Sequence, residues 1–415
     1  MTPLNLSEMR CDENSLRYRT WAEISLDAAE HNYKVIRDLT PTAGICCVIK
    51  GNAYGHGAVM LGHLYESLGA AWFAVSNIEE ALQLRQGGIR TPILILGYTP
   101  VHCAELLAKY GIAQCVYSED YGRALGEHAD RAGVRVRVHI KLDTGMGRIG
   151  FLCRNEEQNE LEQILNVCSQ NSLEPEGLFA HFSSADCADG ENETKEQMQR
   201  FEHAERFLSE RGLTFSIRHC ANSAGIMKYA DSHLDMVRAG IILYGYPPGE
   251  GFEAAKGLIP VMTVRTVVSY VKELRPGETV GYGRTFKAEK PMRVATIPIG
   301  YADGLHRAAG NGRYSVMVNE KPARIVGRIC MDQVMLDVTD VPCSSGDRVT
   351  VFGTKPGNTA DDLARAAGTI SYEVLCAVGG RVPRAYTQKG KLLAWTDLLY
   401  DQDLKKAETV TEREV

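Results

Sequence analysis

Residues 48–57 read VIKGNAYGHG, so that a lysine, Lys50, stands at the end of a short apolar run. A lone lysine at the end of a strand is usually a solvated surface charge, since lysine side chains are mostly exposed. Here glycines and polar residues follow Lys50 directly, and glycine allows a backbone to turn close beside a bound group. The stretch therefore predicts a buried strand that holds the amine of Lys50 at a fixed point.

Similar short apolar segments recur along the chain, and amphipathic stretches with helix signals lie between most of them. The segments cover residues 20–24, 45–49, 72–75, 93–96, 113–117, 134–142, 177–182, 217–220 and 236–237. The helix caps that we expect are Asp27 with Glu30, Ser76 or Asn77, and Thr194 with Gln197. Strands alternating with helices predict βα units around a parallel sheet, and about eight of them predict a closed (β/α)₈ barrel. An open, doubly wound sheet is the alternative, but no dinucleotide-binding GxGxxG follows the first strand.

The pattern changes near Pro260, where the segments become short, β-branched and punctuated by glycine, proline and asparagine. They cover residues 261–274, 279–286, 294–299, 314–318, 323–329, 334–338 and 349–352, with one helix after them over 359–367. We therefore expect three regions: a barrel domain over 20–258, a mainly β domain over 259–397 and a charged tail over 398–415.

Bulk composition excludes several classes of function. The formal net charge of −6 argues against binding to nucleic acid or to an anionic membrane. No apolar run approaches the roughly 20 residues that cross a bilayer, and the N-terminus lacks the apolar core of a signal peptide. The 12 cysteines are scattered without any CxxC, which indicates free thiols in a reducing cytoplasm and no metal site.

In a barrel of this kind, chemistry takes place where strands end and loops begin. Reading off the expected strand ends gives Lys50, Lys141 with Arg148 beyond it, His181, Asn222 with Ser223, and Arg238. Any one of them alone would most simply be a solvated surface charge or a locally hydrogen-bonded residue. The whole set on one rim indicates a reactive, anion-binding site. Ser223 with the small residues after it, and Gly240 followed by Ile241, could present a hydroxyl and backbone N–H groups to a phosphate. A lysine beside a phosphate site points to pyridoxal phosphate, bound to the lysine as a Schiff base.

The stretch at 48–57 closely resembles the pyridoxal-phosphate lysine motif of bacterial alanine racemases, although Gly51 stands where the family commonly has alanine. Further stretches resemble the same family, in order and across both expected domains. They are IKLDTGMGRIG (140–150), HFSSAD (181–186), ANSAG (221–225), MVRAGIILYG (236–245), VGYGRTF (280–286), IPIGYADG (297–304), GRICMDQ (327–333) and ISYEVLC (370–376). The resemblance implies a homodimer with shared active sites that interconverts L- and D-alanine and supplies D-alanine for peptidoglycan.

The resemblance also implies a role for each site residue. The two catalytic bases would be Lys50 and Tyr282 of the partner subunit. The cofactor-binding residues would be Lys50, Tyr54, Arg148, His181, Ser223, Arg238, Gly240, Ile241 and Tyr372, and the substrate contacts Arg148 and Met331. The supporting residues would be Lys141, Asn222, Tyr301 and Asp332, with Lys141 N-carboxylated so that it holds Arg148, and Tyr301 at the entrance.

These residue types fit the chemistry of racemisation. A proton leaves one face of Cα and another returns on the opposite face, so two bases on opposite sides are needed. Arg238 would face the pyridine nitrogen, and arginine cannot hand over a proton. The cofactor would then be a weaker electron sink, which suppresses side reactions such as transamination.

Three other functions remain open at this point. Serine racemases of this fold usually carry a membrane domain and tend to have a smaller polar residue in place of Tyr372, which here narrows the pocket toward a methyl group. A broad-specificity racemase would differ only in loops that set the pocket width. A non-catalytic pyridoxal-phosphate protein resembles the barrel alone, so counterparts of Tyr282 and Met331 argue for an enzyme.

Overall fold

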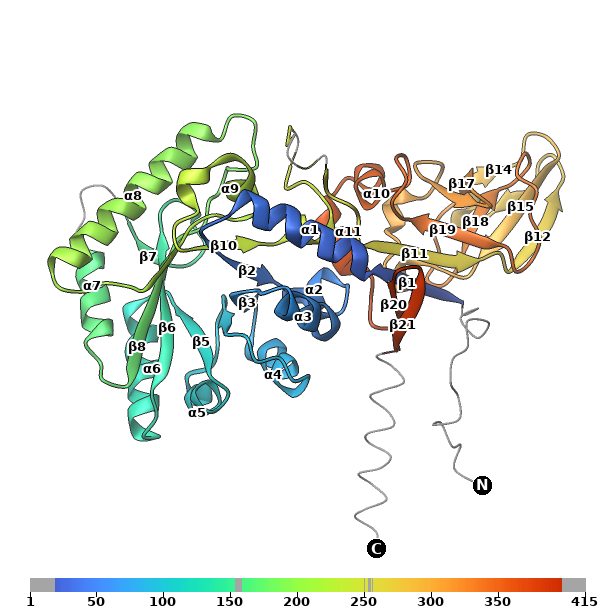
Figure 1. The fold of residues 1–415 in the computed structure, drawn as a ribbon. Helices are drawn as coiled ribbons and strands as arrows, with labels where there is room; N and C mark the ends of the chain where they lie inside the picture. Colours follow the sequence, from blue (N-terminus) through green and yellow to red (C-terminus); the bar gives the residue numbers. More distant parts are fainter. Residues whose placement is uncertain (1–18, 154–158, 250, 253–254, 256, 398–415) are drawn as a thin grey trace, which may run out of the picture. The chain divides into compact units, whose positions relative to one another are not determined.

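The structure, a computed structural model, describes residues 19–153, 159–249, 251–252, 255 and 257–397. These residues form two compact units (Figure 1). One unit is Ala28–Ile259, and the other combines the described residues up to Asp27 with those from Pro260 onward. The tail expected over 398–415 lies outside the described residues.

In the Ala28–Ile259 unit, the described residues form a sheet of parallel strands in the order β10-β2-β3-β4-β5-β6-β8-β9. The strands are β2 (Gly44–Val48), β3 (Trp72–Val75), β4 (Ile93–Ile95), β5 (Ile112–Val116), β6 (Val136–Asp143), β8 (Leu173–Phe179), β9 (Ile217–His219) and β10 (Met236–Ala239), and the short β7 (Phe151–Leu152) pairs with β6. The two end strands meet, since the N–H of Asp235 donates to the carbonyl of Arg218 at 3.2 Å. The sheet is thus a nearly closed barrel, which confirms the predicted fold class over the open sheet.

Helices connect these strands, and their bounds are α1 (Leu26–Leu39), α2 (Lys50–Tyr54), α3 (Ala58–Ser67), α4 (Ile78–Gln86), α5 (Ala104–Lys109), α6 (Glu119–Arg131), α7 (Asn159–Cys168), α8 (Glu191–Glu210) and α9 (Ser223–Lys228). Strands β3, β4 and β5 are buried along their whole length. Strands covered on both faces read as largely apolar runs, with Gln114 of β5 as a buried exception, which is why the sequence located them so closely.

Of the expected helix caps, one is confirmed and two are wrong. Asn77 caps α4, since its Oδ1 accepts a hydrogen bond from the N–H of Glu80 at 2.9 Å. Helix α8 begins a turn earlier than expected, with Gly190 as its cap, and the Thr194 hydroxyl donates back to the Gly190 carbonyl at 2.6 Å. The Asp27 carboxylate accepts instead from the backbone of Lys389, at 2.6 Å. Short polar side chains bond several kinds of backbone partner, so spacing alone does not decide which.

The second unit is mainly β, as predicted, and its large sheet has the order β12-β15-β18-β17-β16-β19-β11-β1-β20-β21. The strands are β1 (Thr20–Ser25), β11 (Met262–Val267), β12 (Tyr270–Leu274), β15 (Met292–Ile297), β16 (Ser315–Val318), β17 (Lys321–Val326), β18 (Val334–Asp337), β19 (Arg348–Phe352), β20 (Arg384–Gln388) and β21 (Lys391–Thr396). A small hairpin is formed by β13 (Thr279–Val280) and β14 (Phe286–Lys287), and the helices are α10 (Ala360–Ala367) and α11 (Ser371–Ala377).

Strand β1 differs from the sequence prediction, which assigned residues from 20 onward to the barrel. It pairs with β11 and β20 in the large sheet of the second unit, with Thr20 opposite Thr266. Such a pairing joins segments far apart in the chain, so a local pattern cannot reveal it. The segment expected over 261–274 is two strands, β11 and β12, and β20 and β21 were not expected. Within the described residues, no helix is long and apolar enough to cross a membrane.

Candidate active site

Lys50 stands at the carboxyl end of β2 and begins the short helix α2. The next residues, 51–54, all have positive φ, with values from 51 to 60°. Such a left-handed run is costly for residues that carry a side chain, so its surroundings must hold it in place. The N–H of Gly51 donates to Glu80 Oε1 at 2.7 Å, and Asn52 Oδ1 accepts from the first N–H of α3 at 2.9 Å. These bonds fix the backbone on which Lys50 stands.

Tyr54, Ser223 and Gly240 converge on one spot near that lysine loop. The N–H of Gly240 donates to Ser223 Oγ at 3.0 Å. A Cβ added at Gly240 would lie 3.0 Å from the Tyr54 hydroxyl and 3.5 Å from Ser223 Oγ. Asn222 caps α9 and so fixes Ser223, while Ile241 begins a 3-10 turn, η4 (Ile241–Tyr244). Because Gly240 has no side chain, two hydroxyls lie close to its backbone, and such a group of hydroxyls and N–H suits a small anion.

Arg238, on β10, is 3% exposed and makes five hydrogen bonds within the barrel. Its NH1 donates to His219 Nδ1 at 2.8 Å and to the His219 carbonyl at 2.9 Å. Its NH2 donates to the carbonyls of Ala180 and Cys220, at 2.7 and 2.9 Å, and to His181 Nδ1 at 3.1 Å. A guanidinium only donates, so Nδ1 of both imidazoles must accept.

This requirement fixes protons along a buried chain of histidines. With Nδ1 of His219 accepting, its neutral ring carries the proton on Nε2, which lies 2.9 Å from His139 Nδ1. His139 then carries its own proton on Nε2, which faces Glu176 Oε2 at 3.8 Å. Burial lowers the pKa of His139, and burial together with the Arg238 charge lowers the pKa of His219 well below its usual range. Both rings are therefore neutral at physiological pH.

His139 and His219 were missed by the sequence analysis, which considered only the ends of strands. A signal was present for His139, because side chains alternate along a strand and His139 is two residues before Lys141. His139 and Lys141 therefore belong to the same face of β6. For His219, the sequence offers no comparable signal.

Lys141 is almost fully buried near the end of β6, and its Nζ donates to the Leu142 carbonyl at 2.6 Å. Burial lowers its pKa to about 8, so an appreciable fraction of its amine is uncharged near neutral pH. Its Nζ also lies 5.4 Å from the centre of the Phe179 ring. Arg148 follows in the segment after β6 and is exposed.

The charges around His181 show the electrostatic character of the barrel site. Burial lowers the pKa of His181 well below its usual range. Four cations lower it further, namely Arg238, Lys141, Arg148 and Lys50 in order of effect. The predicted barrel residues therefore come together in a strongly cationic site, which favours a ligand with phosphate or carboxylate groups.

Three of the predicted residues of the second unit, Tyr282, Met331 and Asp332, lie at a separate feature, an open hollow of about 500 Å³. Its lining is Gly281, Tyr282, Cys330, Met331, Asp332 and Gln333. Tyr282 begins a 3-10 turn, η6 (Tyr282–Arg284), and is 69% exposed, while Met331 is 52% exposed. Large side chains this exposed, around a hollow, are typical of a surface that meets another molecule.

Two further predicted residues lie in this unit outside the lining of the hollow. Tyr301 begins another 3-10 turn, η7 (Tyr301–Asp303), and is 43% exposed. Its N–H donates to the carbonyl of Cys330 at 3.1 Å, so it is joined to the hollow through the backbone. Tyr372 is half-buried in α11.

These features are those of a barrel enzyme with a strand-end lysine at a cationic site, followed by a mainly β domain. A family described as "Alanine racemase, N-terminal domain" matches residues 24–248, and one described as "Alanine racemase, C-terminal domain" matches residues 261–386. The chain therefore belongs to the alanine racemase family.

Individual alanine racemases are similar to this chain over nearly its whole length. The chain is 43% identical to alanine racemase 1 of Clostridium acetobutylicum, covering 90% of this chain and 96% of that protein. It is 44% identical to the alanine racemase of Desulfovibrio desulfuricans, covering 89% and 98%. Among solved structures, Clostridium difficile alanine racemase superimposes with a TM-score of 0.87 at 38% identity, covering 92% and 99%, and one structure of that enzyme is a complex with cycloserine.

Proposed function

We propose that this protein interconverts L- and D-alanine, with pyridoxal phosphate at the barrel site and the β unit of a second copy completing that site. The observation that carries the proposal is a strand-end lysine, Lys50, at a cationic site, on a chain that matches alanine racemases across both of its units. We further propose that it acts in the cytoplasm and supplies D-alanine for peptidoglycan.

The barrel residues fit pyridoxal phosphate. The close approach of the Tyr54 and Ser223 hydroxyls to Gly240, where a Cβ would lie 3.0 Å from the Tyr54 hydroxyl, suits the phosphate group. Lys50 suits the aldehyde carbon, because a fixed primary amine is what forms a Schiff base. Residues that would hold the group are Lys50, Tyr54, Ser223, Arg238, Gly240 and Ile241 with Arg148, His181 and Tyr372. When bound, pyridoxal phosphate supplies the electron withdrawal that makes the Cα hydrogen of alanine acidic.

The chain's own residues then move the proton. Lys50 removes or returns it on one face of Cα, and Tyr282 of the partner subunit acts on the opposite face. Each positioned acid or base contributes about 10²–10⁴-fold in rate. The exposure of Tyr282 beside an open hollow supports its delivery to another subunit. The substrate carboxylate would meet Arg148 on the barrel side and Met331 on the partner side.

Arg238 sets the balance of this chemistry. Its five hydrogen bonds hold the guanidinium rigidly, and it has no proton to transfer near neutral pH. A residue that cannot protonate the cofactor ring limits the electron withdrawal, which disfavours transamination. Lys141, whose pKa is lowered to about 8, has the uncharged amine fraction that reaction with CO₂ requires, and its carbamate would pair with Arg148.

The activity is tested with purified protein, pyridoxal phosphate and a single enantiomer of alanine, with products resolved by chiral chromatography. Enantiomers have equal free energies, so we expect both starting forms to reach equal amounts. A parallel panel containing serine and larger amino acids measures specificity, and kcat/KM highest for alanine supports the proposal. A higher kcat/KM for serine, or broad turnover, would instead support the two alternative racemases.

The two-base assignment is tested with Tyr282→Phe. Racemisation should fall by about 10²–10⁴-fold, because one face of Cα loses its base. Exchange of the Cα hydrogen with deuterated solvent should continue for one enantiomer only, without inversion, since Lys50 remains. Tyr270→Phe is the matched control, a tyrosine that is 58% exposed in the same unit. Exchange that persists equally for both enantiomers, or disappears for both, would contradict the assignment.

A further inference from the structure

Two loops of the β unit contact each other more closely than any residue but glycine would allow. The N–H groups of Tyr301 and Ala302 donate to the carbonyls of Cys330 and Met331, both at 3.1 Å. A Cβ added at Gly300 would lie 2.1 Å from the Met331 carbonyl oxygen. The loop of Tyr301 and the loop of Met331 therefore move as one piece, and whatever anchors the first also places the second.

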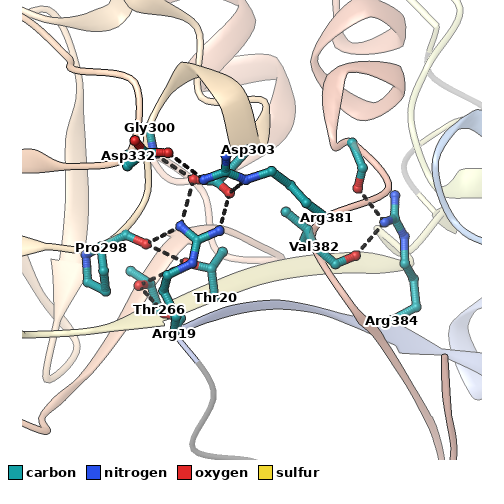
Figure 2. A network of polar contacts seen from close by, with 11 residues as sticks. Arg19, Thr20, Thr266, Pro298, Gly300, Asp303, Asp332, Arg381, Val382 and Arg384 are labelled. Carbon is teal, nitrogen blue, oxygen red and sulfur yellow. Dashed lines mark hydrogen bonds and ion pairs between the residues drawn. The ribbon is translucent and has the colours of Figure 1, made fainter. Parts of the chain in front are cut away.

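A buried carboxylate, Asp303, anchors the first loop (Figure 2). Its side chain is fully buried and receives two hydrogen bonds from Arg19, at 2.5 and 3.0 Å. It also accepts from Arg381 Nε at 2.8 Å and from the N–H of Gly300 at 2.9 Å. A buried charge is tolerated only when it is paired and hydrogen-bonded, and here all of its partners belong to the second unit.

Arg381 also reaches the second loop. Its NH2 donates to Asp332 Oδ1 at 2.6 Å, so one guanidinium binds the buried Asp303 and the half-exposed Asp332 together. The hydrogen bond to Asp332 is the main cause that raises the pKa of Arg381. We call these four residues, Arg19, Asp303, Arg381 and Asp332, the arginine clamp. Its two positive and two negative charges sum to zero.

Asp332 lies where its negative charge could affect substrate binding, so the pairing with Arg381 is important. Asp332 lines the hollow next to Met331, the residue that the proposed function places at the substrate carboxylate. A free carboxylate there would repel the carboxylate of an amino acid, since like charges a few ångströms apart destabilise each other. With Arg381 bonded to it, Asp332 contributes no net charge to the hollow and is turned toward the guanidinium.

We propose that Arg381 is a positioning residue, which neutralises and orients Asp332 so that the hollow accepts a substrate carboxylate. The proposal rests on the proposed function. It assigns to Arg381 an effect on substrate affinity rather than on proton transfer, because Arg381 lines neither the hollow nor the barrel site. Arg19 serves as the second anchor of the same loop pair through Asp303.

The test is a comparison of Arg381→Met with the double variant Arg381→Met/Asp332→Asn. The single variant frees the Asp332 charge, and we expect KM for alanine to rise about five- to tenfold while kcat changes less than about twofold. The double variant removes that charge, and KM should return to within about twofold of the wild type. Arg365→Met is the matched control, since Arg365 forms an exposed ion pair with Asp362 in the same unit.

Each other outcome of these measurements overturns the proposal. An unchanged KM in Arg381→Met shows that the ion pair does not affect binding. A raised KM that Asp332→Asn fails to restore shows that Arg381 acts through the fold instead of through the Asp332 charge. If Arg381→Met does not fold, Arg381→Gln replaces it, because the amide can still donate to Asp303 while its charge is absent.

A second measurement separates failure of this proposal from failure of the proposed function. Thermal unfolding of the protein without substrate gives a double-mutant cycle between positions 381 and 332 that does not depend on racemisation. A melting-temperature effect of the double variant that differs from the sum of the singles supports the ion pair. Simple additivity overturns it, even if the wild type turns over a substrate other than alanine.

Discussion

Arginine is used in two opposite ways in the two units of this chain. In the barrel, the five hydrogen bonds of Arg238 end on imidazole nitrogens and backbone carbonyls, so its positive charge is not cancelled by these partners. In the β unit, Arg19 and Arg381 bind the carboxylates of Asp303 and Asp332, and the charges cancel. The same side chain creates a cationic site in one unit and a neutral scaffold in the other.

Arg238 is buried, whereas the side chains of Arg19 and Arg381 are 38% and 32% exposed, and the kind of acceptor decides what each guanidinium contributes. Neutral acceptors satisfy its hydrogen bonds without satisfying its charge, which leaves an electrostatic attraction for an anionic ligand. Carboxylate partners satisfy both the hydrogen bonds and the charge of the guanidinium, so the residue holds its neighbours in place without attracting an anion. The first arrangement suits a residue that acts on a ligand, and the second suits a residue that holds loops in place.

The largest effect is expected from Arg238→Glu. The variant places a carboxylate, which accepts hydrogen bonds, among the five acceptor atoms that Arg238 now contacts, and it buries a negative charge. We therefore expect kcat for racemisation to fall by about 10²–10³-fold. Because a carboxylic acid can protonate the cofactor ring, the ratio of transamination to racemisation should rise. Keto acid formed per D-alanine formed is the measurement. A ratio equal to that of the wild type would contradict the role proposed for Arg238.

A smaller effect is expected from Asp303→Asn, which breaks the β-unit arrangement without touching the barrel. It removes the buried negative charge between Arg19 and Arg381 and should lower the free energy of unfolding by about 3 kcal/mol. Urea unfolding measures the loss. The control is Asp120→Asn, where a fully exposed carboxylate pairs with Arg123 at 3.6 Å and the change should stay within about 0.5 kcal/mol. Equal effects of the two variants would show that the clamp is an ordinary surface ion pair.

The smallest effect is expected on the pH dependence of stability, through the neutral ring of His139. The pKa of His139 is lowered by burial in the folded protein, so the unfolded chain binds more protons than the folded one below a pH of about 6.5. The contribution of His139 to the free energy of unfolding is therefore fully present above that pH and is lost as the pH falls below it. His139→Asn should remove up to about 1.4 kcal/mol per pH unit of this acid slope.

Unfolding free energies measured between pH 6.5 and 5 give that slope. The exposed His102→Asn serves as the matched control, because its ring is not buried among cations and imidazoles. A slope unchanged by His139→Asn would mean that this ring is not held neutral by the barrel.

Much of this organisation could be predicted from the sequence. Largely apolar runs located β3, β4 and β5, because strands covered on both faces are mostly apolar, with Gln114 of β5 as a buried exception. Lys50, Ser223 and Arg238 were found by one rule, that loops after barrel strands carry the chemistry. The cap at Asn77 was correct because a helix start there is a local event.

Other features could not be predicted. The Thr194 cap failed, since the hydroxyl has a carbonyl partner four residues earlier that the spacing rule does not consider. His219 looked like an ordinary strand residue, and its role appears only when the fold brings its ring to Arg238 on β10 and to His139 on β6. Arg19 and Arg381 are distant in the chain and meet only at Asp303.

By itself, the sequence determined the barrel class, the β unit and the barrel-rim residue types, because apolar periodicity and strand-end composition are local properties of a chain. Only the tertiary structure decided that β1 joins the β unit, that Arg238 is held by neutral acceptors and that Arg381 spans two carboxylates. The physical reason is that hydrogen bonds and charge pairing act over a few ångströms in space, whatever the separation along the chain.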